Sequence, residues 1–143
     1  MPLVRITLRK DLKQETKQAI SDAVHKGLVE EFKIPDSDFW HIIEELEPHN
    51  IQFSRSYLGV EHGDNLVYVQ IVAGKGRTAQ IKKNLFAAIV RHATESQKEV
   101  PPNDIVIVLQ ENNGLEDYSF GNGEVQLPPH LQALADKLAQ EQK

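Results

Sequence analysis

The residue with the greatest potential for chemistry is Pro2, which directly follows the initiator Met1. Initiator methionine is usually removed when the second residue is small, so the sequence predicts a mature chain that begins with proline. Its secondary amine would be basic, since an ordinary terminal amine has a pKa near about 7.7 to 8.0. Such a group can give or take a proton at cellular pH. The plain alternative is a frayed chain end, and the surrounding elements decide between the two.

A second segment suited to chemistry is the glycine-rich loop at 73–78. It carries Lys75 and Arg77 two positions apart, each next to a glycine. Glycines let a backbone approach a ligand closely, and the helix predicted to follow offers free N–H groups. The pattern favours a carboxylate or phosphate site, with a solvated turn as the alternative. It lacks the spacing of a Walker loop or a dinucleotide fingerprint, which disfavours a nucleotide.

A third candidate is Asp38, which stands immediately before Phe39 and Trp40. A carboxylate beside apolar rings can have a raised pKa and can orient water or a substrate proton. The alternative is an aspartate that closes a turn. The histidines show no metal-ligand spacing and the chain has no cysteine, so no metal or cofactor is expected.

Periodic patterns predict the elements that must position these residues. Val4, Ile6 and Leu8 alternate with other residues, as in a strand. Apolar residues then recur at helical spacing from about 12 to 32, before a second strand. The later elements are predicted as a strand at 39–44, a strand at 66–73, a helix at 78–94, and a strand at 105–109 that is buried on both faces.

The two β-α-β patterns match each other at one constant offset, which places Asp38 on Asp104 and Ile20 on Phe86. Right-handed crossovers put both helices on one face of the sheet. The sequence therefore predicts an α+β (α/β) fold, a tandem β-α-β duplication with a four-stranded sheet and a C-terminal helix. The expected organisation is a single domain at 1–143, with a first unit at 2–46, a second unit at 66–110 and a tail and helix at 116–143.

Composition limits the classes of function. The 143-residue chain has a net charge of -5 and a pI near 5.7, which argue against nucleic-acid binding through a broad basic face. No apolar run reaches the roughly 18 residues of a membrane span, and the N-terminus lacks a signal-peptide pattern. We therefore expect a soluble, cytoplasmic protein that binds neither nucleic acid nor membrane.

Together these motifs resemble the tautomerase superfamily of N-terminal-proline enzymes, and within it the malonate semialdehyde decarboxylase-like members. The resemblance runs from residue 1 to about residue 127. The motifs that carry it are Pro2-Leu3, Asp22-Ala23-Val24-His25, Ile34-Pro35 to Asp38, Lys75-Gly76-Arg77-Thr78 and Asp117-Tyr118-Ser119-Phe120-Gly121. The resemblance implies a tautomerase-like fold and a homotrimer in which sheet edges pair between subunits.

The resemblance also implies residue roles. Pro2 would be the catalytic amine, Asp38 its acidic partner, and Arg77 a catalytic group that binds the substrate carboxylate. The other positions implied to bind substrate are Lys75, Tyr118, Phe120 and Leu127. The subgroup has arginine at the position of Lys75 and tryptophan at the position of Tyr118. Lysine offers a point charge where arginine offers a planar fork.

The implied substrate is a small oxo-carboxylic acid, and two reactions stay open. A neutral Pro2 amine would abstract a proton next to a carbonyl, which is keto-enol tautomerisation. A protonated amine would polarise a 3-oxo group for malonate semialdehyde-type decarboxylation, or for hydration with Asp38 placing water. Burial and nearby cations lower the pKa of the amine whereas Asp38 raises it. Two further hypotheses are a non-catalytic trimeric member of the fold and an anion-binding module that uses the loop at 74–78.

Overall fold

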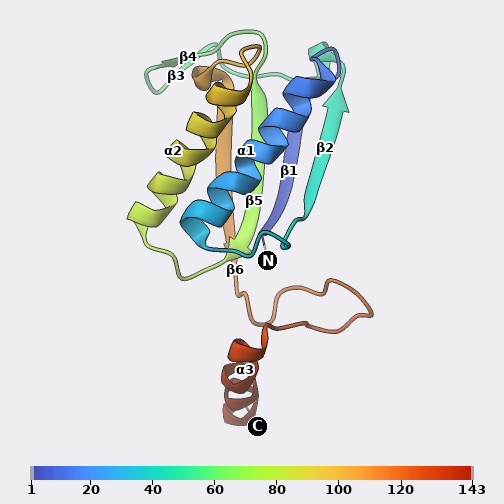
Figure 1. The fold of residues 1–143 in the computed structure, drawn as a ribbon, viewed down its shortest axis with the longest axis vertical. Helices are drawn as coiled ribbons and strands as arrows, with labels where there is room; N and C mark the ends of the chain where they lie inside the picture. Colours follow the sequence, from blue (N-terminus) through green and yellow to red (C-terminus); the bar gives the residue numbers. More distant parts are fainter. Residues whose placement is uncertain (1, 143) are drawn as a thin grey trace.

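The computed structural model describes residues 2–142, with the side chains of residues 129 and 130 left out of the description. Its elements are β1 (Pro2–Arg9), α1 (Gln14–Phe32), β2 (His41–Leu46), η1 (Pro48–Asn50), β3 (Ser56–Tyr57), β4 (Val60–Glu61), β5 (Val67–Gly74), α2 (Ala79–Ser96), η2 (Pro102–Asp104), β6 (Ile105–Asn112) and α3 (Pro129–Glu141). The main sheet has the order β2-β1-β5-β6, and only the central pair, β1 with β5, is antiparallel. α1 and α2 lie side by side over one face (Figure 1). The predicted fold class is confirmed.

The core lies between this sheet and the two helices. Val4, Ile6 and Leu8 of β1 are fully buried, whereas the residues between them face the open side of the sheet or its edge. The helices cross closely at Gly27, where an added Cβ would come within 2.8 Å of Cγ1 of Ile89. The helix residues with little or no exposure in this core are Ile20, Ala23, Val24, Leu28, Leu85, Ala88, Ile89 and Ala93.

The internal repeat is present, but its offset is not constant. In the helices Ile20 corresponds to Leu85 rather than to Phe86, because Leu85 belongs to the buried face of α2 and Phe86 does not. From the turn onward the predicted match of Asp38 with Asp104 holds. The N–H groups of these two residues each donate to the carbonyl of the proline that opens the turn, both at 3.0 Å. The second unit therefore has one additional residue between its helix and its turn.

The predictions for two strands need correction. β6 continues to Asn112 and is not buried on both faces, since Val108 is 55% exposed. In the described chain the helices cover only one side of the sheet, and β6 is at its edge. β2 begins at His41 rather than at Phe39, because pairing with β1 starts only where the Val4 N–H donates to the Trp40 carbonyl, at 2.9 Å.

α3 stands apart from the sheet and its two helices, beyond the end of the sheet from which β6 leaves (Figure 1). In the described chain it faces the segment after β6 across a groove of about 280 Å³. The apolar lining of that groove consists of Leu115, Val125, Ala135, Leu138 and Ala139.

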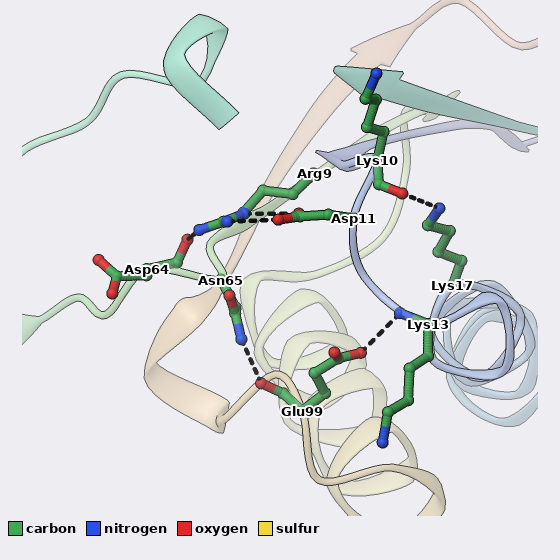
Figure 2. A network of polar contacts seen from close by, with 8 residues as sticks. All are labelled: Arg9, Lys10, Asp11, Lys13, Lys17, Asp64, Asn65 and Glu99. Atoms are coloured by element: carbon green, nitrogen blue, oxygen red, sulfur yellow. Dashed lines mark hydrogen bonds and ion pairs between the residues drawn. The ribbon is translucent and has the colours of Figure 1, made fainter. Parts of the chain in front are cut away.

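A polar network closes the end of the sheet at which β1 finishes, opposite to Pro2 (Figure 2). The Arg9 guanidinium bonds both carboxylate oxygens of Asp11 and the carbonyl of Asp64. The buried Lys17 ammonium donates to the Lys10 carbonyl at 2.7 Å and pairs with Glu45 at 3.3 Å. These basic side chains hold loops together at this end of the sheet.

The same network extends to the connection before η2. The Lys13 N–H donates to the Glu99 carboxylate at 3.0 Å, and the Asn65 side chain donates to the Glu99 carbonyl at 2.9 Å (Figure 2). In the register that matches Ile20 with Leu85, the loop at 10–13 corresponds to the loop at 75–78. In the first unit this loop has a structural function, because its residues bind neighbouring segments (Figure 2). In the second unit the equivalent loop carries the two candidate cations.

Candidate active site

Pro2 is buried at the start of β1, between two other segments of the sheet. On one side it pairs with Ala73, near the end of β5. On the other side β1 meets the residues that enter β2, where the Val4 N–H bonds the Trp40 carbonyl. Met1, whose removal the sequence predicts, lies outside the described residues. The basic loop follows β5, and Asp38 precedes the residues that enter β2. The fold therefore brings the loop and Asp38 toward the start of β1.

The basic loop after β5 is fixed by contacts from three elements. The Lys75 N–H donates to the Asn112 carbonyl at 2.8 Å. The Arg77 guanidinium donates to the Gly74 carbonyl at 3.1 Å and to the Phe32 carbonyl, at the end of α1, at 3.5 Å. It also stands 4.3 Å over the Phe32 ring, a cation–π contact. Arg77 is therefore held in place, whereas Lys75 is exposed.

Glu111 joins this loop, and it was not among the predicted site residues because the last strand was predicted to end at residue 109. Its carboxylate pairs with Lys82 of α2 at 2.5 Å, and it also interacts with the backbone of Gly76. The hydrogen bond from Lys82 is the main cause that lowers the pKa of Glu111, and the charge of Arg77 adds to it. Burial lowers the pKa of Arg77, and Glu111 opposes that shift. The carboxylate and the loop form one charged cluster.

Aromatic side chains gather on the other side of the start of β1. The Tyr118 and Phe120 rings are 5.3 Å apart, and the Phe120 and Trp40 rings are 4.6 Å apart. Burial raises the pKa of Tyr118, and the negative charge of Asp38 adds to that rise. The structure thus brings Asp38 close to the predicted wall. Trp40 was not predicted to belong to the wall, although its position shortly after Asp38 was a usable signal.

The wall residues sit on a loop that closes on itself through Gln126. The Tyr118 hydroxyl donates to the Gln126 backbone carbonyl at 2.6 Å. The Phe120 N–H donates to the side-chain oxygen of Gln126 at 2.8 Å. Leu127 follows directly and is half-buried. The predicted residues therefore form two groups, Lys75 and Arg77 on the β5 side and the Asp38 aromatic group on the β2 side. Their catalytic roles stay a prediction.

A pair of histidines lies near this wall, between α1 and β2. The His25 and His41 rings are 5.9 Å apart, and the Ser21 hydroxyl is 2.9 Å from Nδ1 of His41. Burial, followed by the charge of His25, lowers the pKa of His41 to about 4, so this imidazole is neutral at pH 7. Among the described side chains, no group of three His, Asp or Glu residues is arranged to hold a metal ion.

The repeat separates the turn function of Asp38 from its side-chain function. Asp104 makes the same backbone turn, but its carboxylate is 1% exposed and accepts the Gly63 N–H at 2.6 Å. Asp38 is only half-buried, and its charge acts on Tyr118. The shared turn therefore does not account for the different surroundings of the two carboxylates.

Replacing Asp104 by alanine should lower the free energy of unfolding by about 1–3 kcal/mol, because the Gly63 N–H loses its acceptor in a buried place. Urea unfolding measures the change. Asp38→Ala is the matched control, since it alters the same turn position in the other unit, and we expect a smaller loss of stability from it. Equal losses in both variants would show that the two carboxylates have the same structural function.

The chain is similar to proteins of known family. A family model described as "Tautomerase enzyme" matches residues 38–121, and a second with the same description matches residues 2–60. "Probable tautomerase YusQ" of Bacillus subtilis (strain 168) is 33% identical over 127 residues, which cover 89% of this chain and 98% of the relative. "Probable tautomerase YrdN" of the same organism is 29% identical over 126 residues, covering 88% and 95%.

Solved structures agree with these matches. A malonate semialdehyde decarboxylase, FG41, inhibited by 3-bromopropiolate, has a TM-score of 0.78 and 32% identity, and the match covers 97% of this chain and 96% of the other. A fused 4-OT, solved as a symmetric trimer, shares the fold with a TM-score of 0.68 at 20% identity, covering 86% and 94%. Among the described residues no helix is long and apolar enough to cross a membrane. The family matches, the relatives and the fold together show that the chain belongs to the tautomerase family.

Proposed function

We propose that the chain is an N-terminal-proline enzyme that catalyses the keto-enol tautomerisation of a small oxo-carboxylic acid. The observation that carries the proposal is the place of Pro2, buried at the start of β1 between the strand that leads to Arg77 and the segment that holds Asp38. A proton-transfer group, a carboxylate binder and an apolar wall then meet at one end of the sheet. The names of the two Bacillus relatives support the same reaction class.

The chemistry of the proposal follows from the charges at the two sides of Pro2. Lys75 and Arg77 bind the substrate carboxylate, and they lower the pKa of the amine. The neutral amine takes the proton from the carbon next to the carbonyl, and the electron pair of that C–H bond forms the enolate. The proton is then delivered to the enolate oxygen, which completes the enol. The aromatic group of Trp40, Tyr118 and Phe120 excludes water on the other side.

Decarboxylation of a 3-oxo acid is the second candidate, favoured by the proximity of Asp38 to Tyr118 and by the likeness to a malonate semialdehyde decarboxylase. In this reaction Asp38 raises the pKa of the amine, and the protonated amine polarises the 3-oxo group. The bond to the carboxylate breaks, carbon dioxide leaves, and the electron pair forms an enolate that is then protonated on carbon. Asp38 can also place water for hydration.

A pH-rate profile tests the proposal and separates the two reactions. Mass spectrometry should first show that the purified chain lacks Met1. If the amine is a base, kcat/KM for phenylpyruvate should rise with pH through the pKa of the amine and then level off. If it is an acid, kcat/KM for malonate semialdehyde should fall through that pKa. A chain that retains Met1 and turns over neither compound would instead support the non-catalytic member of the fold.

We also propose that the protein works as a homotrimer, as the symmetric fused 4-OT does. The face of the sheet opposite the helices carries exposed apolar side chains, among them Leu3, Ile42 and Val108. A groove of about 270 Å³ runs along this face. Burying such a face against other copies removes apolar surface from water. Size-exclusion chromatography with light scattering measures the number of subunits.

A further inference from the structure

The ion pair between Glu111 and Lys82 changes the charge balance beside the candidate anion-binding loop. The two side chains meet at 2.5 Å and are 31% and 28% exposed, so the pair is partly open to water. Without Glu111, three cations would stand at or near the loop, namely Lys75, Arg77 and Lys82. Glu111 neutralises one of them, and two positive charges are left for a ligand.

The backbone of Gly76, the residue between the two candidate cations, also interacts with Glu111. It helps to lower the pKa of Glu111, after the larger effect of Lys82. Gly76 has a φ of 126°, a conformation that favours glycine. Glu111 therefore interacts with the loop as well as with Lys82.

The register of the sheet places Glu111 close to the proposed chemistry. Ala73 of β5 pairs with Pro2 on one side and with Glu111 on the other. The three residues form one row across the sheet, and neighbouring strands are about 4.8 Å apart. Pro2 is buried on the helix side, and Glu111 reaches Lys82 of α2 on that side. Within this row the residue between them is Ala73, which has a small side chain.

We propose that Glu111 is a specificity-determining residue that makes the site select oxo acids with one carboxylate over those with two. The inference rests on the proposed function, because it assumes that substrate binds between Pro2 and the basic loop. The first carboxylate of a substrate is neutralised by Lys75 and Arg77. A second carboxylate meets the carboxylate of Glu111, and it finds Lys82 already paired. Like charges at short range disfavour the dianion.

The internal repeat supplies a matched control. Lys17 and Glu45 form the equivalent pair in the first unit, at the end of the sheet opposite to Pro2. Lys17 corresponds to Lys82 in the register of the helices, and Glu45 corresponds to Glu111 in the register of the turns. Glu45→Gln therefore removes the same kind of charge from the same kind of ion pair, but far from the candidate site.

The test compares oxaloacetate, a dianion, with its 4-methyl ester, a monoanion of nearly the same shape. Each compound gives a kcat/KM for enol-keto conversion. The measured quantity is the value for the ester divided by the value for oxaloacetate. The wild-type chain should favour the ester, and Glu111→Gln should shift the ratio toward oxaloacetate by about fivefold to tenfold, since one like charge is removed near the ligand. Glu45→Gln should leave the ratio unchanged. An unchanged ratio in Glu111→Gln, with both substrates slowed equally, overturns the inference.

A binding measurement keeps this test independent of catalysis. Succinate and monomethyl succinate are titrated while the Gly76 amide is followed by NMR. The ester should bind more tightly than succinate to the wild-type chain, and Glu111→Gln should narrow that difference by a similar factor. If that result appears without turnover of any oxo acid, the inference about Glu111 stands and the proposed function fails. Equal preference for the two ligands in both chains overturns the inference even if the enzyme is active.

Discussion

Replacing Pro2 by alanine should lower kcat/KM for the proposed tautomerisation by about two to four orders of magnitude, the range over which a positioned acid or base acts. Alanine keeps a terminal amine but loses the ring, which fixes φ and aims the nitrogen. At the start of β1, where the backbone already pairs with Ala73, that ring decides the direction of the lone pair. Initial rates with phenylpyruvate measure the loss, and circular dichroism checks the fold.

An insertion variant separates the amine from the ring. An alanine placed between Met1 and Pro2 leaves the mature chain beginning Ala-Pro, so the proline ring stays but its nitrogen becomes an amide without basicity. Activity should then be lost as fully as in Pro2→Ala. Pro35→Ala serves as the control for removing a proline from this chain, and it should remain active. Full activity in the insertion variant would exclude the amine as the catalytic group.

The fold was predictable because its signals are local. Alternation at Val4, Ile6 and Leu8 and the helical stripe around Ile20 each identify an element within a few turns of chain. The matching turns at Asp38 and Asp104 revealed the duplication. The offset of the helices was wrong by one position, since an apolar residue such as Phe86 beside the true stripe matches almost as well as Leu85. Only packing shows which of the two is buried.

The site was predictable only in part, because it depends on contacts between distant segments. The motifs pointed to Pro2, Asp38 and Arg77. They did not show that Trp40 would meet Phe120, which lies in a much later segment of the chain, or that Glu111 would pair with Lys82 beside the basic loop. The first contact depends on the path of the loop after β6. The second depends on the register of β5 and β6, which no single segment encodes.

The duplication also explains why the chemistry is expected at one end of the sheet. β1 and β5 are antiparallel, so the two units place equivalent loops at opposite ends. In the first unit the position equivalent to Arg77 is Leu12, which is buried, and the position equivalent to Pro2 in the second unit is Val67, an internal residue without an amine. The charges at that end hold loops together instead (Figure 2). Among the described residues, Pro2, the predicted terminal amine, and the basic loop both belong to the other end.

Replacing Arg77 should give the second large effect, mainly through substrate binding. Arg77→Ala removes a charged donor to the substrate carboxylate, for which we expect kcat/KM to fall roughly tenfold to a hundredfold, chiefly as a higher KM. Arg77→Lys keeps the charge. A lysine has no planar fork, however, so it cannot donate to Gly74 and Phe32 and still face a ligand. We therefore expect the lysine variant to recover only part of the loss.

Stability must be measured with activity, because Arg77 also stands over the Phe32 ring. Losing that contact should lower the free energy of unfolding by about 1 kcal/mol. That loss leaves nearly all of the protein folded, so it cannot account for a hundredfold loss of kcat/KM. Arg91→Ala is the control, since Arg91 pairs with Glu30 on the surface of the helices. If Arg91→Ala raised KM as much as Arg77→Ala, the effect would come from the overall charge of the chain. A rise confined to Arg77→Ala would place the substrate carboxylate at the basic loop.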